Sequence, residues 1–305
     1  MKIATVGRSS VGAGTVALVS ALAIGCANVS GSGDLPAAPP ADWAYERLEP
    51  QVYTPPGWPE ALEATVYRPQ RAGALPAVLV VHGGGWARRS PADMQRICRA
   101  LASRGFVAVN VAYRLAPAYR YPAPLEDLQQ ALNWMQANAA ELQIDAGRIG
   151  GFGYSAGAHL VSLLALLESS ADPSWRPPGG APRLQAVVAG GTPADLTRWP
   201  KSPLVNQFIG SSIQASPEVW AQASPVSHVT PASPPFFLYH GGFDRLVEVE
   251  QAQALKRSLD GVGVPTTLYT VPYHGHLSMF LLNRSAVRRA SAFLSEALDA
   301  SVPDG

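Results

Sequence analysis

Short apolar runs bounded by glycine or proline recur along the chain, and longer segments with helical spacing of apolar residues separate them. The runs 75–81 and 266–271 have the length and β-branched content of strands, and the first is apolar enough to be buried on both faces. Residues 125–139 form an amphipathic helical pattern, and residues 158–167 are apolar around the whole helix. This alternation predicts one α/β domain with a mostly parallel central sheet and helices on both faces. Further strands are expected over 148–152, in a run that ends near residue 189 and in a run that starts near residue 235. Further helices are expected over 92–103, 249–259 and 277–298.

The sequence Gly-Tyr-Ser-Ala-Gly occupies residues 153–157, between a predicted strand and a predicted buried helix. Ser155 therefore lies on a strand-to-helix turn. Glycines two positions away on either side allow a turn so sharp that a β-carbon there would collide with the adjoining element. This is the pattern of a nucleophile elbow, in which the helix start offers N–H groups and a positive dipole end to an oxyanion. The alternative is an ordinary glycine-rich turn, and the other motifs of the chain must distinguish between the two.

Three consecutive glycines follow the buried strand 75–81. Glycine loses more conformational freedom on folding than any other residue, so such a run at a strand end calls for a functional reason. We predict that it surrounds a developing oxyanion with bare N–H groups. The expected donors are Gly84 and Gly85 together with the N–H of Ala156, and Gly83 is a further candidate. A flexible surface loop is the alternative.

The residues that flank these motifs have more than one possible use. We predict that His82 shapes the glycine loop through hydrogen bonds and does not transfer protons. Trp86 and Tyr154 are predicted to contact the substrate. For Trp86 a role as a packing anchor is the alternative.

A serine hydroxyl is a weak nucleophile unless a histidine takes its proton and a carboxylate orients that histidine. In this architecture the acid precedes the histidine in the chain. Asp244 follows the strand that starts near 235, which places it at the same sheet edge as Ser155. His274 and His276 both follow the strand 266–271. We predict His276 as the base, because it follows a glycine and opens the last helix, with His274 as the alternative.

The other acids and histidines have simpler structural explanations. Glu126 and Asp127 open the amphipathic helix, where acidic side chains stabilise the helix dipole. Asp195, in an irregular segment, is a remote alternative for the acid. His159 is predicted to be structural, His240 is predicted to end a buried strand, and His228 falls in a proline-rich loop. No spacing of histidine, cysteine and carboxylate typical of a metal site occurs, so neither a metal nor another cofactor is predicted.

Taken together, these motifs resemble the α/β-hydrolase superfamily, and within it the hormone-sensitive-lipase-like and ferulic-acid-esterase-like carboxylesterases. The resemblance covers residues 60–298 and implies hydrolysis of short acyl or aryl esters, with a small cap insertion over the site. The elbow departs from the hormone-sensitive-lipase-like pattern at Tyr154, usually aspartate, and at Ala158, often glycine. The motifs that carry the resemblance lie at 82–86, 112–117, 121–127, 153–157 and 240–244.

A proline-rich stretch without regular periodicity, residues 190–235, is predicted to be the cap-like insertion above the carboxyl ends of the strands. Its apolar residues suit an uncharged acyl or aromatic substrate. The candidates for its inner face are Trp199, Leu204, Phe208, Ile209 and Trp220.

The N-terminal residues have the pattern of an export signal. Lys2 and Arg8 precede an apolar run, 11–24, that is too short for a standard membrane span, so residues 1–25 are predicted to be a signal peptide. Cys26 follows at once and resembles the lipid-modified cysteine of bacterial lipoproteins, with plain cleavage nearby as the alternative. We expect an exported protein, lipid-anchored in the bacterial periplasm or cell envelope.

Residues 26–55, rich in small residues and proline at their start, are then a flexible tether and lead-in to a catalytic domain over 56–300. Cys98 is expected to be buried without a disulfide partner. The 305 residues carry a net charge of +1 and only 15% charged residues, which gives no electrostatic footprint for nucleic acid.

The expected partners are thus a small ester substrate and a membrane reached through the lipid anchor alone. A serine carboxylesterase that works through an acyl-enzyme fits these features best. An amide hydrolase of the arylformamidase or prolyl-peptidase kind and a non-catalytic binding lipoprotein are the alternatives.

Overall fold

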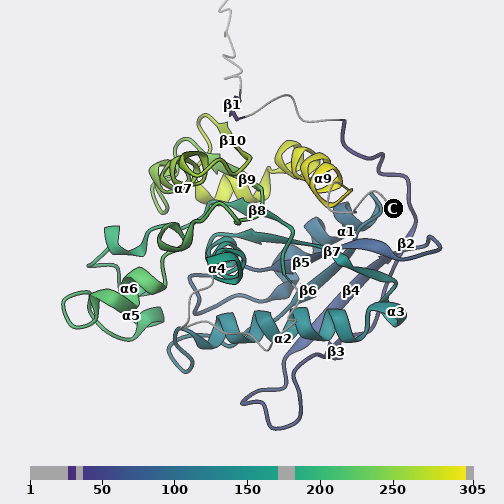
Figure 1. The fold of residues 1–305 in the computed structure, drawn as a ribbon, viewed down its shortest axis with the longest axis horizontal. Helices are drawn as coiled ribbons and strands as arrows, with labels where there is room; N and C mark the ends of the chain where they lie inside the picture. The colour runs from purple at the N-terminus through teal and green to yellow at the C-terminus, as the bar shows by residue number, and fades with distance from the viewer. Residues whose placement is uncertain (1–26, 32–36, 171–182, 300–305) are drawn as a thin grey trace, which may run out of the picture.

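The computed structural model describes residues 27–31, 37–170 and 183–299, so the predictions for the signal peptide and Cys26 lie outside the described residues. Within these ranges the chain forms a twisted sheet with helices on both sides (Figure 1). The strands follow the order β1-β10-β9-β8-β7-β5-β6-β4-β2, and β3 pairs with β4. The run from β10 to β6 is parallel, whereas β1, β2, β3 and β4 pair in antiparallel fashion. The predicted α/β fold is confirmed.

The described elements have the following bounds. The strands are β1 (Asn28–Ser30), β2 (Tyr45–Arg47), β3 (Gln51–Val52), β4 (Glu63–Pro69), β5 (Leu75–Val81), β6 (Val107–Val111), β7 (Ile144–Tyr154), β8 (Ala186–Gly190), β9 (Phe236–Gly241) and β10 (Thr266–Val271). The helices are η1 (Pro91–Met94), α1 (Gln95–Ala102), α2 (Ala123–Ala137), α3 (Ala139–Leu142), α4 (Ala156–Ser170), η2 (Leu196–Arg198), α5 (Pro203–Ile209), α6 (Pro217–Gln222), η3 (Pro225–His228), α7 (Val249–Gly261), α8 (His276–Leu281) and α9 (Arg284–Asp299).

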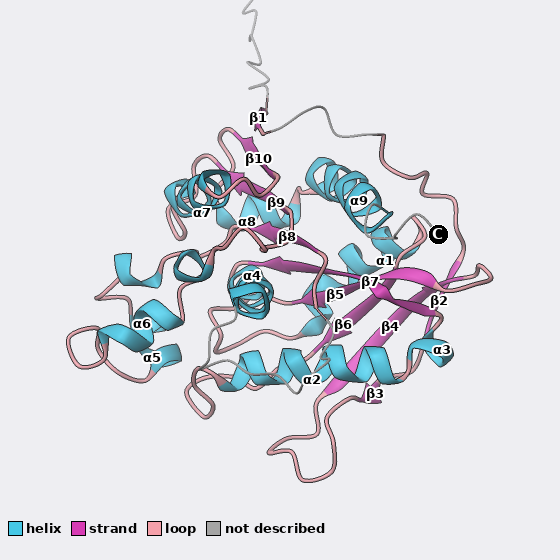
Figure 2. Ribbon diagram, viewed as in Figure 1, coloured by secondary structure: helices cyan, strands magenta, loops and turns pink. Residues whose placement is uncertain are grey.

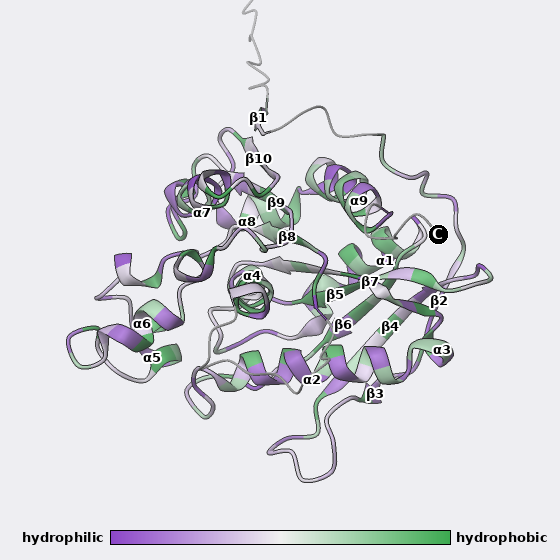
Figure 3. Ribbon diagram, in the orientation of Figure 1, coloured by the Kyte–Doolittle hydropathy of each residue, from purple (hydrophilic) through white to green (hydrophobic). Residues whose placement is uncertain are grey.

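The apolar runs become strands because both of their faces are covered. In β5, Leu79 and Val81 belong to a core cluster shared with α2, α4 and α7, whereas Val78 and Val80 belong to a cluster shared with α1 and α9. Successive side chains of a strand point to opposite faces, so a strand between two helical layers must be apolar throughout. Figure 2 shows the two helical layers, and Figure 3 shows that α2 and α9 carry both hydrophobic and hydrophilic residues.

The last helix is broken, which corrects the prediction of one helix over 277–298. It divides into α8 and α9 around Leu282 and Asn283. Asn283 is fully buried, and its side-chain oxygen accepts a hydrogen bond from Arg96, 2.7 Å away. Arg96 also donates to the carbonyl of Phe280, near the end of α8. These tertiary bonds satisfy the carbonyl of Phe280 and the side-chain oxygen of Asn283 at the break, and sequence periodicity does not reveal them.

Two loop predictions also differ from the structure. Part of the predicted tether forms β1, which pairs with β10. The stretch 190–235 is not wholly irregular, because it contains η2, α5, α6 and η3. In both segments the ordered pieces are short, and packing against the rest of the domain stabilises them more than their own propensity does.

The carboxyl ends of four parallel strands carry the predicted site. The glycine loop follows β5, Ser155 follows β7, Asp244 follows β9, and His276 follows β10. In sheets of this class ligands bind at the carboxyl edge. Among the described ranges, none of the helices combines the length and apolar composition needed to cross a bilayer.

Candidate active site

Ser155 is the single residue between β7 and α4, and its backbone is in the left-handed region with φ of 55°. Such a conformation is costly for a residue with a side chain and persists only where its surroundings hold it. The Ser155 N–H donates to the carbonyl of Gly190, 2.8 Å away, and the Ser155 carbonyl accepts from the N–H of His159. Hydrogen bonds to strand β8 and from helix α4 therefore fix the conformation of the elbow.

The two outer glycines of the elbow permit its close packing. A β-carbon at Gly153 would collide with the backbone of Gly157, and one at Gly157 would collide with the carbonyls of Val81 and His82. Neither position can take a side chain without movement of backbone. The glycine spacing predicted for the elbow thus has a steric cause in this structure.

His276 and Asp244 are joined by a hydrogen bond of 2.6 Å between Nδ1 and Oδ2. The other carboxylate oxygen of Asp244 accepts from the N–H groups of Leu246 and Val247, at 3.0 and 2.9 Å. Burial by itself raises the pKa of Asp244, but hydrogen bonds from His240 and His276, the histidine charge and the Val247 N–H outweigh it and lower the pKa overall. Asp244 is therefore held as a carboxylate that accepts the Nδ1 proton of His276.

His240 is a second neighbour of Asp244, and sequence analysis predicted only that it ends a buried strand. Its Nε2 atom lies 2.8 Å from the carbonyl of Val247 and 3.5 Å from Oδ2 of Asp244. His240 is the penultimate residue of β9 and is fully buried. The signal was present in the motif at 240–244, where His240 stands four residues before the acid.

His274, the alternative base, makes different contacts. Its Nδ1 atom lies 3.2 Å from the carbonyl of Pro272, and its own carbonyl accepts from the N–H of Phe243. No hydrogen bond or ion pair joins His274 to Asp244 among the residues that the structure describes. The histidine that the structure pairs with the acid is His276.

Tyr154 links the nucleophile elbow to the histidine loop. Its hydroxyl donates to the carbonyl of His276 over 2.6 Å, and the two rings have centroids 5.1 Å apart. A β-carbon at Gly191 would lie 3.0 Å from Cε1 of His276 and 3.1 Å from the Tyr154 hydroxyl. The His276 ring thus packs beside the residue that immediately precedes Ser155.

The glycine loop approaches the elbow most closely at Gly83. A β-carbon there would lie 2.8 Å from the carbonyl oxygen of Tyr154 and 3.1 Å from Cβ of Ser155. Gly84 and Gly85 have φ of 116° and 61°, which favours glycine. Within the described ranges the N–H groups of all three glycines donate to no protein acceptor. They remain free to bind an anionic oxygen.

His82 shapes this loop. Its Nδ1–H donates to the carbonyl of Gly83, 2.7 Å away, and its ring stacks on Tyr113 with centroids 4.4 Å apart. Tyr113 in turn donates its hydroxyl to the carbonyl of His82. Burial lowers the pKa of His82 to about 4, so the ring is neutral at physiological pH.

Trp86 anchors the loop to α5, in the segment 190–235 that is predicted to be the cap. Its ring stacks on Phe208 of α5 at 4.6 Å, and its Nε1–H donates to Nδ1 of His159 over 3.2 Å. His159 donates from Nε2 to the carbonyl of Ala223, 2.7 Å away, and burial lowers its pKa to about 4. A neutral histidine thus bridges the elbow helix, the glycine loop and the cap.

The two residues predicted to contact substrate, Trp86 and Tyr154, are both buried and make the internal contacts described above. Their role in substrate contact stays a prediction. Leu204, on α5, is only partly buried, and its Cδ1 atom would lie 3.2 Å from a β-carbon on Gly85. Of the other residues predicted for the inner face of the cap, Phe208, Ile209 and Trp220 are buried in the core.

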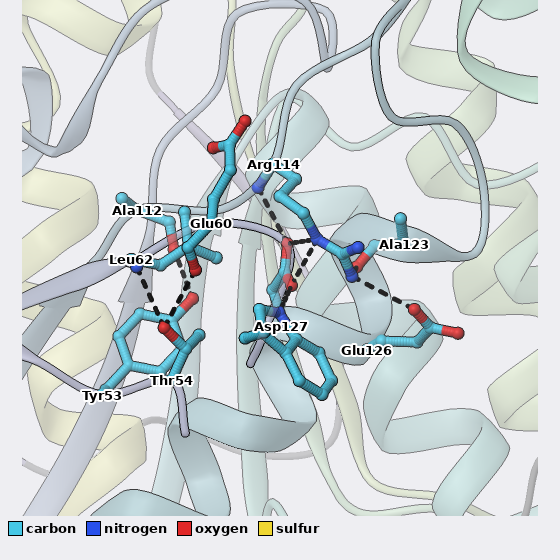
Figure 4. A network of polar contacts seen from close by, with 10 residues as sticks. Tyr53, Thr54, Glu60, Leu62, Ala112, Arg114, Ala123, Glu126 and Asp127 are labelled. Atoms are coloured by element: carbon cyan, nitrogen blue, oxygen red, sulfur yellow. Dashed lines mark hydrogen bonds and ion pairs between the residues drawn. The ribbon is translucent and has the colours of Figure 1, made fainter. Parts of the chain in front are cut away.

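A buried ion pair supports the segment between β6 and α2 (Figure 4). Asp127 is fully buried, and it accepts from the backbone N–H and from Nε of Arg114 at 2.8 and 2.7 Å. The indole of Trp58 donates a further hydrogen bond of 2.8 Å to Asp127. Asp127 lies near the start of α2, as predicted, and it is also the buried counter-ion of Arg114, a partner that sequence analysis missed.

The described residues contain no cluster of three histidine, cysteine or carboxylate side chains that could hold a metal ion. Cys98 is buried and free, and burial raises the pKa of its thiol.

The chain was compared with models of known protein families. The BD-FAE family model matches residues 65–259, more than half of the chain, which includes the glycine loop, Ser155 and Asp244. The chain belongs to the BD-FAE family. The resemblance to α/β-hydrolase carboxylesterases that the motifs predicted is confirmed.

Two similar relatives of this BD-FAE chain come from Mycobacterium tuberculosis. Esterase LipC is 32% identical over 213 residues, which cover 66% of this chain and 52% of LipC. The probable carboxylic ester hydrolase LipM is 31% identical over 238 residues, which cover 73% of this chain and 55% of LipM. The chain thus spans about half the length of these relatives.

Solved structures share the fold. A truncated carbohydrate esterase from gut microbiota superposes with a TM-score of 0.71 at 21% identity, covering 86% of this chain and 99% of that chain. Esterase 2 of Thermogutta terrifontis with bound butyrate has a TM-score of 0.68 at 22% identity, with 86% and 95% coverage. At this identity the likeness shows the α/β-hydrolase fold of the BD-FAE chain and no more.

Proposed function

We propose that this protein is a serine carboxylesterase that hydrolyses short-chain or aryl esters through an acyl-enzyme. The observation that carries the proposal is the 2.6 Å hydrogen bond between His276 and Asp244, beside an elbow that holds Ser155 at φ of 55°. A nucleophile, a base and an orienting acid are the three groups that acyl transfer requires.

In the proposed reaction Ser155 Oγ attacks the ester carbonyl while Nε2 of His276 takes the serine proton. The tetrahedral intermediate collapses when His276 returns that proton to the leaving alcohol, which leaves an acyl group on Ser155. Water then attacks the acyl carbon with His276 again as base, and the carboxylic acid leaves. Asp244 holds the Nδ1–H tautomer and stabilises the imidazolium that forms twice in each cycle.

The oxyanion of each intermediate needs donors already in place. The unused N–H groups of Gly83, Gly84 and Gly85 support an oxyanion site, with the N–H of Ala156 at the start of α4 as the further donor. The loop is fixed by His82 and Trp86, so the donors need little reorganisation during the reaction.

Ester substrates are supported by the names of the relatives, which are esterases and carboxylic ester hydrolases. A short acyl group is supported by Leu204, whose side chain lies close to Gly85 at the proposed oxyanion loop. An apolar wall at this point favours an uncharged acyl chain over a charged one.

The test is hydrolysis of p-nitrophenyl butyrate by the wild type and by Ser155→Ala. We expect the substitution to lower kcat at least about 10³-fold, because it removes the nucleophile. Ser162→Ala is the matched control, since Ser162 lies on α4, the helix that follows Ser155, and its buried hydroxyl has no partner among the described residues. Full activity of Ser155→Ala would refute the proposal.

Matched ester and anilide substrates then separate ester hydrolysis from amide hydrolysis. We expect the ester to be cleaved faster by several orders of magnitude. Faster cleavage of the anilide would favour an amide hydrolase, and no turnover of either would favour a binding protein.

We also propose that the protein is exported and lipid-anchored at Cys26, with residues 1–25 removed. The support is the order of a basic start, an apolar run over 11–24 and a cysteine in the sequence. Mass spectrometry of the membrane-associated protein should find a diacylated N-terminal cysteine, and Cys26→Ala should abolish that modification. An unmodified N-terminus at another residue would refute the anchor.

A further inference from the structure

Six large apolar side chains are exposed around the proposed active site. They lie on the loop after β9, on the loop after β10 and on α8 with its end, and each is 57–73% exposed. We call this set the rim patch. Its members are Phe243, Leu246, Tyr273, Leu277, Leu281 and Leu282.

The rim patch rests on ordered structure. The Phe243 N–H donates to the carbonyl of His274 over 2.9 Å, which fastens the two loops to each other. Leu277 and Leu281 are four residues apart on α8 and so share one face of that helix. The opposite side of α8 is anchored by buried Met279 and by the bond from Arg96 to the carbonyl of Phe280. The exposed leucines are therefore held outward by the packing of α8.

The described chain begins at this same edge of the sheet. β1 runs antiparallel to β10, so Asn28 pairs with Thr270, near the carboxyl end of β10 (Figure 2). Ala27 is partly buried against the same core cluster as Val271 and Phe280. The segment before Ala27 contains the apolar run 11–24 and Cys26. A membrane attachment through this segment would thus start beside the rim patch and not at the far side of the domain.

The flanking charge is positive on the side of α8 and α9. Between residues 261 and 295 the chain carries three arginines and no aspartate or glutamate, whereas Glu248 and Glu250 are exposed after Leu246. Arg284 is exposed at the start of α9, close behind Leu282, and Arg288 is exposed one helical turn further on. The guanidinium of Arg245 lies 5.4 Å from the ring centroid of Phe243. Apolar side chains flanked by arginine match the chemistry of an anionic lipid surface.

We propose that the rim patch docks on an anionic phospholipid bilayer, so that the carboxyl edge of the sheet and the proposed active site face the membrane. Exposed apolar patches of this kind mark interaction surfaces. The diacylated Cys26 of the proposed anchor would fix the chain to a bilayer at one point, and the rim patch would then set which side of the domain faces that bilayer. This inference goes beyond ester hydrolysis and does not depend on it.

The test places an environment-sensitive NBD label on the full-length chain at Leu281→Cys or, separately, Leu246→Cys. The control site is Glu141→Cys on α3, at the other end of the sheet from β1 (Figure 1). The labelled parent chain measures the background from Cys26 and Cys98. Vesicles of phosphatidylcholine, with and without phosphatidylglycerol, are then added at low and high salt.

We expect a blue shift and a gain of at least about twofold in emission at positions 281 and 246 with phosphatidylglycerol vesicles, weakened by salt. Position 141 should not change. The pair Leu281→Asp and Leu282→Asp should abolish the shift at position 246. Turnover of soluble p-nitrophenyl butyrate without vesicles reports folding of each variant and tests the proposed catalysis separately.

Vesicle-bound protein without a shift at positions 281 and 246 would overturn the proposal. A shift that follows protein concentration in the absence of lipid would also overturn it, because a second copy of the chain would then cover the rim patch.

Discussion

The Nδ1 atom of His276 lies 2.6 Å from Oδ2 of Asp244, and the other oxygen of the same carboxylate accepts two backbone N–H groups. The acid is therefore fixed before substrate arrives, with one oxygen turned to the imidazole. This arrangement leaves Nε2 of His276 as the atom that exchanges protons with Ser155 in the proposed reaction.

Asp244→Asn should lower kcat about 10³–10⁴-fold, because the amide favours the wrong imidazole tautomer while keeping the shape of the site. KM should change little. Asp195→Asn is the control, since Asp195 was the remote alternative for the acid and caps η2 through Thr197. Steady-state kinetics on p-nitrophenyl butyrate measure both, and equal loss in the two variants would refute the assignment.

Gly83→Ala should reduce kcat/KM by about 10–100-fold, since its β-carbon would push against Tyr154 and Ser155 and shift the nucleophile by a fraction of an ångström. Gly147→Ala is the matched control, because its β-carbon would meet only Asp145 at an ordinary 3.4 Å. We expect the two variants to have comparable melting temperatures, while only Gly83→Ala loses kcat/KM. Unchanged activity of Gly83→Ala would show that this loop does not touch the reacting centre.

His159 should make the fold less stable in acid. Burial lowers its pKa from 6.5 to about 4, so below pH 6.5 the unfolded chain binds a proton that the folded chain does not. Stability is then lost as the pH falls from 6.5 to 4, by up to about 1.4 kcal/mol per pH unit. His159→Gln should show a smaller loss over that range in chemical denaturation. His82 titrates similarly in both proteins, so the difference between them isolates His159.

The buried pair of Arg114 and Asp127 gives a stability prediction. Asp127→Asn leaves the Arg114 charge without its buried counter-ion and should cost about 3–5 kcal/mol of unfolding free energy. Glu126→Gln removes the second carboxylate that contacts the Arg114 guanidinium. The Glu126 side chain is 45% exposed, so this substitution should cost less than about 1 kcal/mol of unfolding free energy. Urea titrations measure both values, and equal costs would contradict the assigned burial.

Elements with a single strong local signal could be predicted from the sequence. The bounds of β5 and β10 follow from apolar or β-branched runs ended by glycine or proline, and Ser155 follows from its flanking glycines. Local periodicity carries no information about which distant group a side chain meets. The break at Asn283 depends on Arg96, and the place of β1 depends on β10.

The same limit applies to the site. The contact between Asp244 and His276 could be predicted because chain order in this architecture restricts the candidates. The second neighbour of the acid, His240, and the pairing of Arg114 with Asp127 depend on burial and on contacts across the fold. The bridge from Trp86 through His159 to Ala223 joins three segments that no sequence spacing relates.

The most direct test of the central claim is covalent labelling with a fluorophosphonate, followed by peptide mapping. The account predicts one adduct, on Ser155, that is lost in Ser155→Ala and forms much more slowly in His276→Ala and Asp244→Asn. An adduct on a different residue, or labelling of Ser155→Ala at the wild-type rate, would contradict it.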